Sequence, residues 1–182
     1  MIDEIRITYH GAVPGCPHLR ESQLNALKRR AWLPVGAYWH EHYVMKHFTH
    51  EGGREYRYAP RAGETGNERK SFWRSYTGWK QKHLGHTNPL VLSGELRDMA
   101  KIYRLEATAT STESKLRVIL PMAQKANLRN PKSRFQINMR EELTTVSEQE
   151  AEVLVGIFDR ELQNQLNEVQ DTSTHIIRFF HG

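Results

Sequence analysis

The chain has 182 residues, which suits one domain, or a domain with arms, and is long enough to bury a hydrophobic core. Its 26 basic and 21 acidic residues leave a formal net charge of +5, which is compatible with an acidic partner but does not require one. The single cysteine, Cys16, excludes an internal disulfide and any zinc site built from several cysteines.

Apolar side chains make up only 38% of the chain, which predicts a small core with extended parts. Uninterrupted apolar runs are very short, as in Val118 to Leu120, and none is long enough to cross a membrane. The first ten residues, MIDEIRITYH, lack the charged-then-apolar order of a signal peptide. We therefore expect a protein that is made and kept in a reducing cytoplasm.

The N-terminal part of the chain predicts one strand and two helices. Residues 5–9 alternate apolar and polar side chains, as in a half-buried strand. Apolar residues then recur at helical spacing behind Ser22, which is the expected N-cap. We expect Pro34 to divide this helix from a second one, over about Val35 to His50, that ends at the glycine pair 52–53.

No helical or strand period continues through residues 54–86. We predict that they form an extended arm or loop inserted into a single domain spanning residues 1–182, and a loop of this length favours a binding role. Its basic residues outnumber its acidic ones, and aromatic residues are interleaved with them. The basic residues are Arg54, Arg57, Arg61, Arg69, Lys70, Arg74, Lys80 and Lys82, and the aromatic ones are Tyr56, Tyr58, Phe72, Trp73, Tyr76 and Trp79.

The second half shows clearer periods. Ser93 is the expected cap of a short helix ending near Lys101, and a hairpin follows, with strands at 103–109 and 116–120. Residues 126–139 are expected to form a loop. Ser147 and Glu150 have the spacing of a capping box that opens an amphipathic helix to about Val169.

A closing strand is expected over His175 to Phe180. The order of these elements predicts an α+β fold. In it, a mostly antiparallel sheet packs against the long C-terminal helix, with the N-terminal helices and the aromatic and basic arm beside them.

Four histidines in the predicted second helix could in principle hold a metal, because His47 and His50 share a helical face. The spacing is not His-Glu-x-x-His, and capping or solvent-exposed histidines explain the same pattern, which is the interpretation we favour. The four are His40, His42, His47 and His50.

Neither of the other enzyme motifs we considered is complete. Cys16 lies between two prolines, with nothing in the sequence to activate its thiol. Residues 63–70, GETGNERK, lack the Gly-Lys-Ser/Thr of a phosphate-binding loop. We therefore predict no catalytic residue, no metal ligand and no cofactor, and a protein that is not an enzyme.

The cations and rings of residues 54–82 have the chemistry to neutralise phosphates and stack on exposed bases. No helix-turn-helix, zinc-finger or RNA-binding signature accompanies them. Long cationic side chains mixed with aromatic rings also anchor protein interfaces. We favour a protein interface and keep DNA binding through this segment as the alternative.

The run GHTNPLVLSGELR, residues 85–97, resembles the Arg/Asn-Pro-Leu-Val-x-Thr/Ser-Gly-x-Leu-Arg element of a phage protein group. The group comprises the tail-completion and virion-morphogenesis proteins of long-tailed double-stranded DNA phages. The segments HFTHEGGREYRYAPRAGE and INMREELTTVSEQEAEVLVGIFDRELQNQLN are also similar to it, so the resemblance covers about residues 47–167. Ser93 stands where threonine is common in the group.

Residues 89–96 are expected to join the mobile arm to a rigid body. Pro89 and Leu90 would fix an extended approach, and Val91 and Leu92 would enter the core. The Ser93 hydroxyl would accept a backbone N–H from the turn that begins at Gly94. The expected junction residues are Pro89, Leu90, Ser93, Gly94 and Leu96.

The resemblance implies a structural virion protein at the head-tail junction, assembled in the host cytoplasm. It would be a ring-forming tail-completion or neck subunit that joins the tail to the DNA-filled head by association. The implied partners are copies of itself in a ring, expected to be a hexamer, a tail terminator or tail-tube protein, and a head-completion or adaptor protein. Non-specific contact with DNA in the channel is possible, and no membrane is involved. The expected interface residues are Tyr56, Tyr58, Arg61, Phe72, Trp73, Arg74, Tyr76, Trp79, Lys80 and Lys82.

Overall fold

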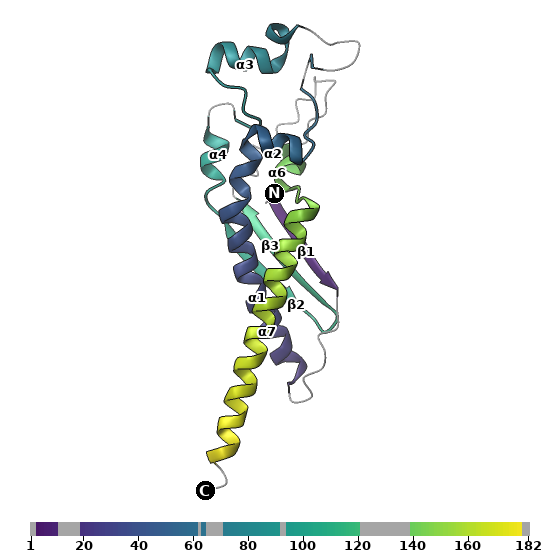
Figure 1. Ribbon diagram of the computed structural model, residues 1–182, viewed down its shortest axis with the longest axis vertical. Helices are drawn as coiled ribbons and strands as arrows, with labels where there is room; N and C mark the ends of the chain where they lie inside the picture. The colour runs from purple at the N-terminus through teal and green to yellow at the C-terminus, as the bar shows by residue number, and fades with distance from the viewer. Residues whose placement is uncertain are drawn as a thin grey trace. The chain divides into compact units, whose positions relative to one another are not determined.

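The computed structural model describes residues 3–10, 19–61, 63–64, 71–91, 94–120 and 139–179 (Figure 1). The chain separates into two compact units, each assembled from distant segments. Unit 1 comprises Met1–Glu4, His40–Arg104 and Ile119–Ser147, and unit 2 comprises Ile5–Trp39, Leu105–Val118 and Glu148–Gly182. This division differs from the predicted single domain with an arm at residues 54–86.

Unit 2 contains most of a three-stranded sheet with the strand order β1-β3-β2. Its strands are β1 (Asp3–His10), β2 (Arg104–Ala109) and β3 (Glu113–Leu120), and neighbouring strands run antiparallel (Figure 1). The β2–β3 turn is closed by the Thr110 N–H, which donates to the Glu113 carbonyl at 2.7 Å. The predicted N-terminal strand and the predicted hairpin are therefore confirmed.

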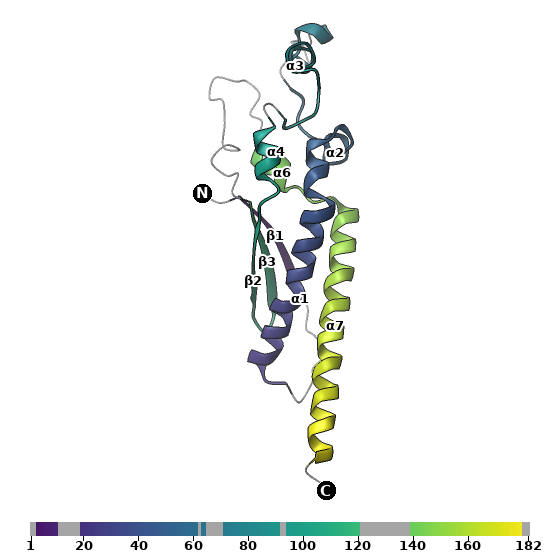
Figure 2. The same cartoon turned by 90° about the vertical axis from the view of Figure 1, so that its left-hand side faces the viewer.

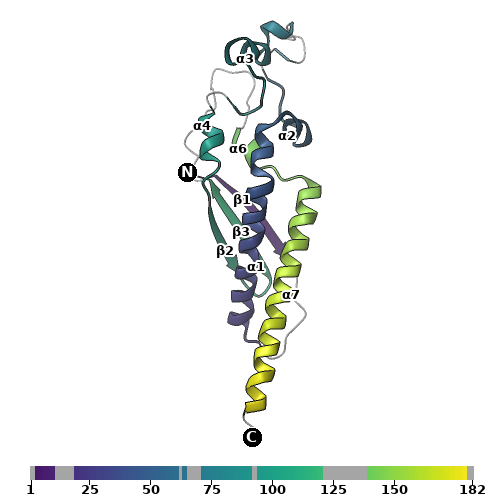
Figure 3. The ribbon, with the colours of Figure 1, turned by 60° about the vertical axis from the view of Figure 1, so that its left-hand side comes forward.

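Two helices, α1 (Glu21–His42) and α7 (Glu148–Phe179), lie on one face of this sheet (Figures 2 and 3). A Cβ added at Gly36 would lie 2.6 Å from a methyl carbon of Leu105, so glycine permits α1 to approach the sheet closely. The rings of Trp32 and Phe158 join α1 to α7, with centroids 4.3 Å apart. The predicted α+β fold, with a sheet packed against the long C-terminal helix, is confirmed.

The core of unit 2 follows the predicted periods. The apolar face predicted for the last helix is buried from Leu154 to Leu166, whereas Val153 is 41% exposed and Val169 is partly exposed. Burial of these side chains is the main source of stability in a unit of this kind. The buried apolar residues of unit 2 are Leu27, Ala31, Trp32, Val35, Trp39, Leu116, Val118, Leu154, Ile157, Phe158, Leu162 and Leu166.

Lys28 is a buried cation in unit 2, only 1% exposed. Its Nζ donates to the carbonyls of Thr110 and Ser111 at 3.1 and 3.0 Å. Burial lowers the pKa of Lys28. The ammonium therefore fastens α1 to the turn of the β2–β3 hairpin, where a tight turn leaves carbonyls without a strand partner.

Two of the predicted helix and strand boundaries are wrong. Pro34 lies inside α1, which is continuous. The carbonyl that loses its donor belongs to the exposed Arg30, where water can bond it, so the break in the hydrogen-bond ladder is tolerated. The strand predicted from His175 is helix instead, because α7 continues to Phe179. Each residue added to an existing helix gains a hydrogen bond, so continuation is easier than a new start.

Unit 1 is built from short helices. They are the 3₁₀ helices η1 (Val44–Phe48) and η3 (Phe72–Arg74) and the α-helices α2 (His50–Glu55), α3 (Tyr76–Leu84), α4 (Glu95–Met99) and α6 (Met139–Thr144). Its buried apolar residues are Val44, Phe48, Tyr56, Leu90, Val91, Ala100, Ile119, Leu120 and Leu143.

The glycine pair predicted to stop a helix lies inside α2 instead. Thr49 caps α2, because its hydroxyl accepts the Gly52 N–H at 3.1 Å. A Cβ at Gly52 would lie 2.0 Å from the Lys46 carbonyl oxygen, so glycine is needed where α2 turns back on η1. The second predicted helix is therefore divided into the end of α1, η1 and α2.

Several sequence predictions lie outside the described residues. They concern Cys16, Leu92, the Ser93 cap and the loop at 126–139 apart from Met139. Among the residues that the structure describes, no helix combines the length and the apolar composition needed to cross a membrane.

Candidate interaction surface

Residues 71–85 form a helical segment in unit 1, which we call the η3–α3 segment. Ser75 caps α3, since its hydroxyl accepts the Gly78 N–H at 3.1 Å and donates to the Phe72 carbonyl at 2.6 Å. A Cβ at Gly78 would lie 1.9 Å from the Phe72 carbonyl oxygen. Gly85 ends α3 with a left-handed backbone, at φ 73°. Local bonds and one close contact therefore hold η3 against α3.

This segment exposes large rings. Phe72 and Trp73 are 50% and 65% exposed, and Tyr76 and Trp79 are 38% and 43% exposed. Tyr76 and Trp79 are stacked with centroids 6.2 Å apart, and Trp79 stacks on His83 at 5.0 Å. Scattered exposed rings are ordinary, whereas a run of adjacent ones is typical of an interaction site.

Two of the six aromatic residues predicted as interface anchors, Tyr56 and Tyr58, lie outside the η3–α3 segment. Tyr56 is buried and stacks on His47, with the planes 6° apart and the centroids 4.0 Å apart. The Tyr58 hydroxyl lies 2.6 Å from His47 Nδ1 and donates to the His47 carbonyl at 3.2 Å. Tyr56 is therefore part of the interior of unit 1, and the prediction that it anchors a free arm is wrong.

Arg61, predicted as an interface cation, is held inside unit 1. Its guanidinium makes two hydrogen bonds of 2.7 Å with the carboxylate of Glu142. Burial acts to lower the pKa of Arg61, but the bonds and charge of Glu142 outweigh it and the pKa is raised. Glu142 also accepts the Ala59 N–H at 3.2 Å, so the carboxylate is bonded on both oxygens.

Lys80 is likewise internal and is only 3% exposed. Its Nζ donates to the Asn88 carbonyl, which ties α3 to the residues before α4. Burial, with a smaller effect of the Arg61 charge, lowers the pKa of Lys80 to about 8. Of the four predicted interface cations, Arg74 and Lys82 are therefore the two that are exposed, whereas Arg61 and Lys80 are bonded within unit 1.

The predicted junction at residues 89–96 is compact. Pro89 and Leu90 form a turn in which Leu90 has a positive φ of 55°, so the predicted extended approach is wrong. Val91 is buried as predicted. Gly94, at φ 81°, is the residue before α4, where L-residues other than glycine are strained. Leu96 is partly exposed on α4.

The four histidines of the predicted cluster have separate surroundings. His40 Nε2 is 2.8 Å from the Ala100 carbonyl, and its ring stacks on Tyr103 at 3.8 Å. His50 Nε2 is 2.7 Å from the Thr87 hydroxyl. His47 is buried between tyrosines, and His42 is exposed. Over the described ranges, no three His, Cys, Asp or Glu side chains are placed to hold a metal ion.

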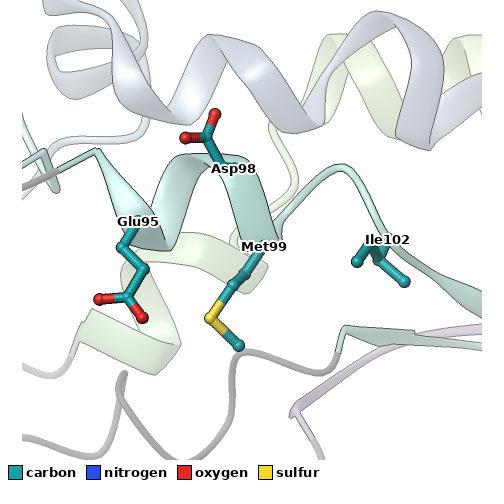
Figure 4. Close-up of a pocket in the computed structure, with 4 residues that line it drawn as sticks. All are labelled: Glu95, Asp98, Met99 and Ile102. Carbon is teal, nitrogen blue, oxygen red and sulfur yellow. The ribbon is translucent and has the colours of Figure 1, made fainter.

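An open depression lies beside α4, lined by Glu95, Asp98, Met99 and Ile102 (Figure 4). Glu95 and Met99 point to one side of the helix and Asp98 points to the other (Figure 4). The Asp98 carboxylate accepts from Lys101 Nζ at 2.9 Å. The two carboxylates therefore do not converge, as a pair working in general acid and base catalysis would.

The sequence carried one signal for the missed helix α3. Ser75 is a typical N-cap and Gly85 a typical C-terminal stop, and the residues between them are enough for a short helix.

Comparisons of the whole chain with protein-family models, curated proteins and solved structures gave no match. Function must therefore be inferred from the η3–α3 segment and from the sequence resemblance of residues 47–167.

Proposed function

We propose that this chain is a structural virion protein at the head-tail junction of a long-tailed double-stranded DNA phage. It is a ring-forming tail-completion or neck subunit that joins the tail to the DNA-filled head. The observation that carries the proposal is the row of exposed rings on the η3–α3 segment, together with the resemblance of residues 85–97 to that group.

The rings supply the contact energy for such a joint. A fully buried aromatic side chain contributes about 150–250 Å² to an interface. With their exposed fractions of 38% to 65%, the four rings offer roughly 400 Å². A stable interface takes about 800 Å² from each partner, so these rings would form the centre of one and not the whole.

The mechanism is association without catalysis. The caps and close contact that hold η3 on α3 present the rings in a formed helix, so little chain entropy is lost on binding. This differs from an arm that gains its order only from a neighbour. Tryptophan and tyrosine lead among residues that dominate interface energies. The exposed Arg74 and Lys82 add attraction to acidic surfaces.

The test is complementation in the phage that carries this gene. Without the gene product we expect filled heads and complete tails that stay separate in negative-stain electron micrographs. The wild-type gene should restore joined particles, and Trp73→Ala with Trp79→Ala should not. Normal numbers of joined, infectious particles without the protein would refute the proposal.

The alternative, DNA binding through residues 54–82, has less support. Arg61 and Lys80 are bonded internally, and Tyr56 is buried. The observation that favours DNA binding is that Arg74 and Lys82 are exposed in the same segment as the exposed rings. Proteins that bind single-stranded nucleic acid combine cations and aromatic rings in this way.

A further inference from the structure

We propose that the η3–α3 segment of one copy docks on the outward face of α7 of the next copy. The contact is therefore head-to-tail, and it builds the ring. This inference rests on the proposed role as a ring-forming subunit and names the two surfaces that meet. Two different surfaces on each copy make a heterologous contact, which closes into a ring when the rotation between copies permits it.

The donor surface is aromatic and cationic. Residues 71–85 contain no acidic side chain. Trp73 is the most exposed ring, at 65%, and Trp79, which lies in α3, is 43% exposed. Arg74 and Lys82 are exposed in the same segment, whereas Lys80 is internal. A partner surface must therefore offer apolar area and negative charge.

The first half of α7 offers both. Val155 is 40% exposed and supplies apolar area on this helix. Four exposed residues follow one another at spacings of four, three and four, which places them on one stripe of the helix. They are Glu148, Glu152, Val155 and Asp159.

The charges of the two surfaces are opposite. On α7 the stripe exposes the acids Glu148, Glu152 and Asp159, whereas Glu150 is buried at 2% exposure and does not contribute to the surface. Residues 71–85 expose Arg74 and Lys82 and contain no acid. Such patterning selects a partner and suppresses contact between like surfaces. It disfavours α3 pairing with α3, and α7 pairing with α7.

The experiment uses full-length variants with substitutions at exposed positions, followed by sedimentation and native mass spectrometry. The ring-surface variant is Trp73→Ala with Trp79→Ala, and the acid-surface variant is Glu152→Lys with Asp159→Lys. The matched control, Glu41→Lys with Glu51→Lys, makes the same change in net charge at exposed residues of α1 and α2. Circular dichroism checks that each variant is folded.

We expect wild type and the control to assemble. Each surface variant alone should bind its own copies at least ~100-fold more weakly, because one loses the tryptophan anchors and the other sets positive charges against Arg74 and Lys82. Mixing the two surface variants should give a one-to-one dimer and nothing larger. The acid-surface variant supplies intact rings, the ring-surface variant supplies an intact α7, and only one good contact can form.

A charge swap tests the pairing itself. Arg74→Glu with Lys82→Glu should prevent assembly, and adding Glu152→Lys and Asp159→Lys to the same chain should restore at least part of it. Normal rings from the acid-surface variant, or no dimer from the mixture, would overturn the α7 contact and leave the ring-forming role standing. A wild-type protein that stays monomeric at high concentration would overturn both.

Discussion

Arg61 and Glu142 form the best-satisfied ion pair among the described residues of unit 1. Their side chains are 13% and 8% exposed, and two 2.7 Å bonds join them. We expect Glu142→Gln or Arg61→Met alone to lower the free energy of unfolding by about 3–5 kcal/mol, because either change leaves the other charge buried and unpaired. Urea denaturation monitored by circular dichroism measures the loss.

The double variant Arg61→Met with Glu142→Leu is the control for this pair. It removes both buried charges, so it should recover most of the stability lost by either single change. Equal losses from the single and double variants would show that packing, and not the unpaired charge, sets the cost.

His47 should make the stability of unit 1 depend on pH. Burial lowers the pKa of His47 to about 4 from its usual 6.5. The unfolded chain therefore binds a proton between these values that the folded chain does not. The contribution of neutral His47 to the free energy of unfolding is fully present above pH 6.5 and is lost as the pH falls from 6.5 to about 4. The loss amounts to about 3 kcal/mol.

The comparison that isolates His47 is wild type against His47→Asn across pH 7 to 4. The difference in unfolding free energy should shrink as the pH falls, because asparagine does not titrate. Parallel profiles for wild type and His47→Asn would contradict the prediction.

At the scale of elements, the η3–α3 segment depends on one glycine. An added Cβ at Gly78 would meet the Phe72 carbonyl oxygen at 1.9 Å and Trp73 Cα at 2.8 Å, and backbone atoms cannot move aside as a side chain can. We expect Gly78→Ala to separate η3 from α3 at a cost of about 1–3 kcal/mol. Faster amide hydrogen exchange in residues 76–84 and a changed near-ultraviolet tryptophan spectrum would report it.

The matched change is Gly156→Ala, where an added Cβ meets nothing within 4 Å. There alanine should stabilise α7 by about 0.5–1 kcal/mol, because it removes the entropy cost of glycine in a helix. If Gly78→Ala is as harmless as Gly156→Ala, the close packing of η3 on α3 is not what holds the rings in place.

The helix α3 also shows what sequence periods cannot reveal. The hairpin and α7 were predictable because their buried residues repeat every two residues or along one helical face. In α3 the buried residues are Gly78 and Lys80, and the rings are exposed, so no apolar period exists. The continuous α1 was missed for a different reason, because a proline is only a local penalty, which the rest of the helix outweighed.

At the scale of the whole molecule, the number of charged residues could be read from the sequence, but not which of them would be bonded internally and which would face a partner. The eight basic residues of segment 54–82 look alike in sequence. The partner of Arg61 is 81 residues away along the chain, and Lys80 bonds a carbonyl eight residues on. Pairing at such sequence separations depends on the tertiary fold. The sequence therefore predicted a cationic segment correctly but overcounted the cations that can meet a partner.

This distinction gives a test of DNA binding as a property of the whole protein. Lys80→Met and Lys82→Met each remove one positive charge, so both lower the net charge of +5 equally. At pH 7, below its pKa of about 8, Lys80 stays charged, and only its internal position separates it from Lys82. If the chain binds DNA through residues 54–82, Lys82→Met should flatten the slope of log K against log salt by about 0.9 in low-salt DNA titrations, the value for one phosphate contact. Lys80→Met should leave the slope unchanged. Equal flattening by both would contradict the internal position of Lys80, and the absence of measurable DNA binding would count against the DNA-binding alternative.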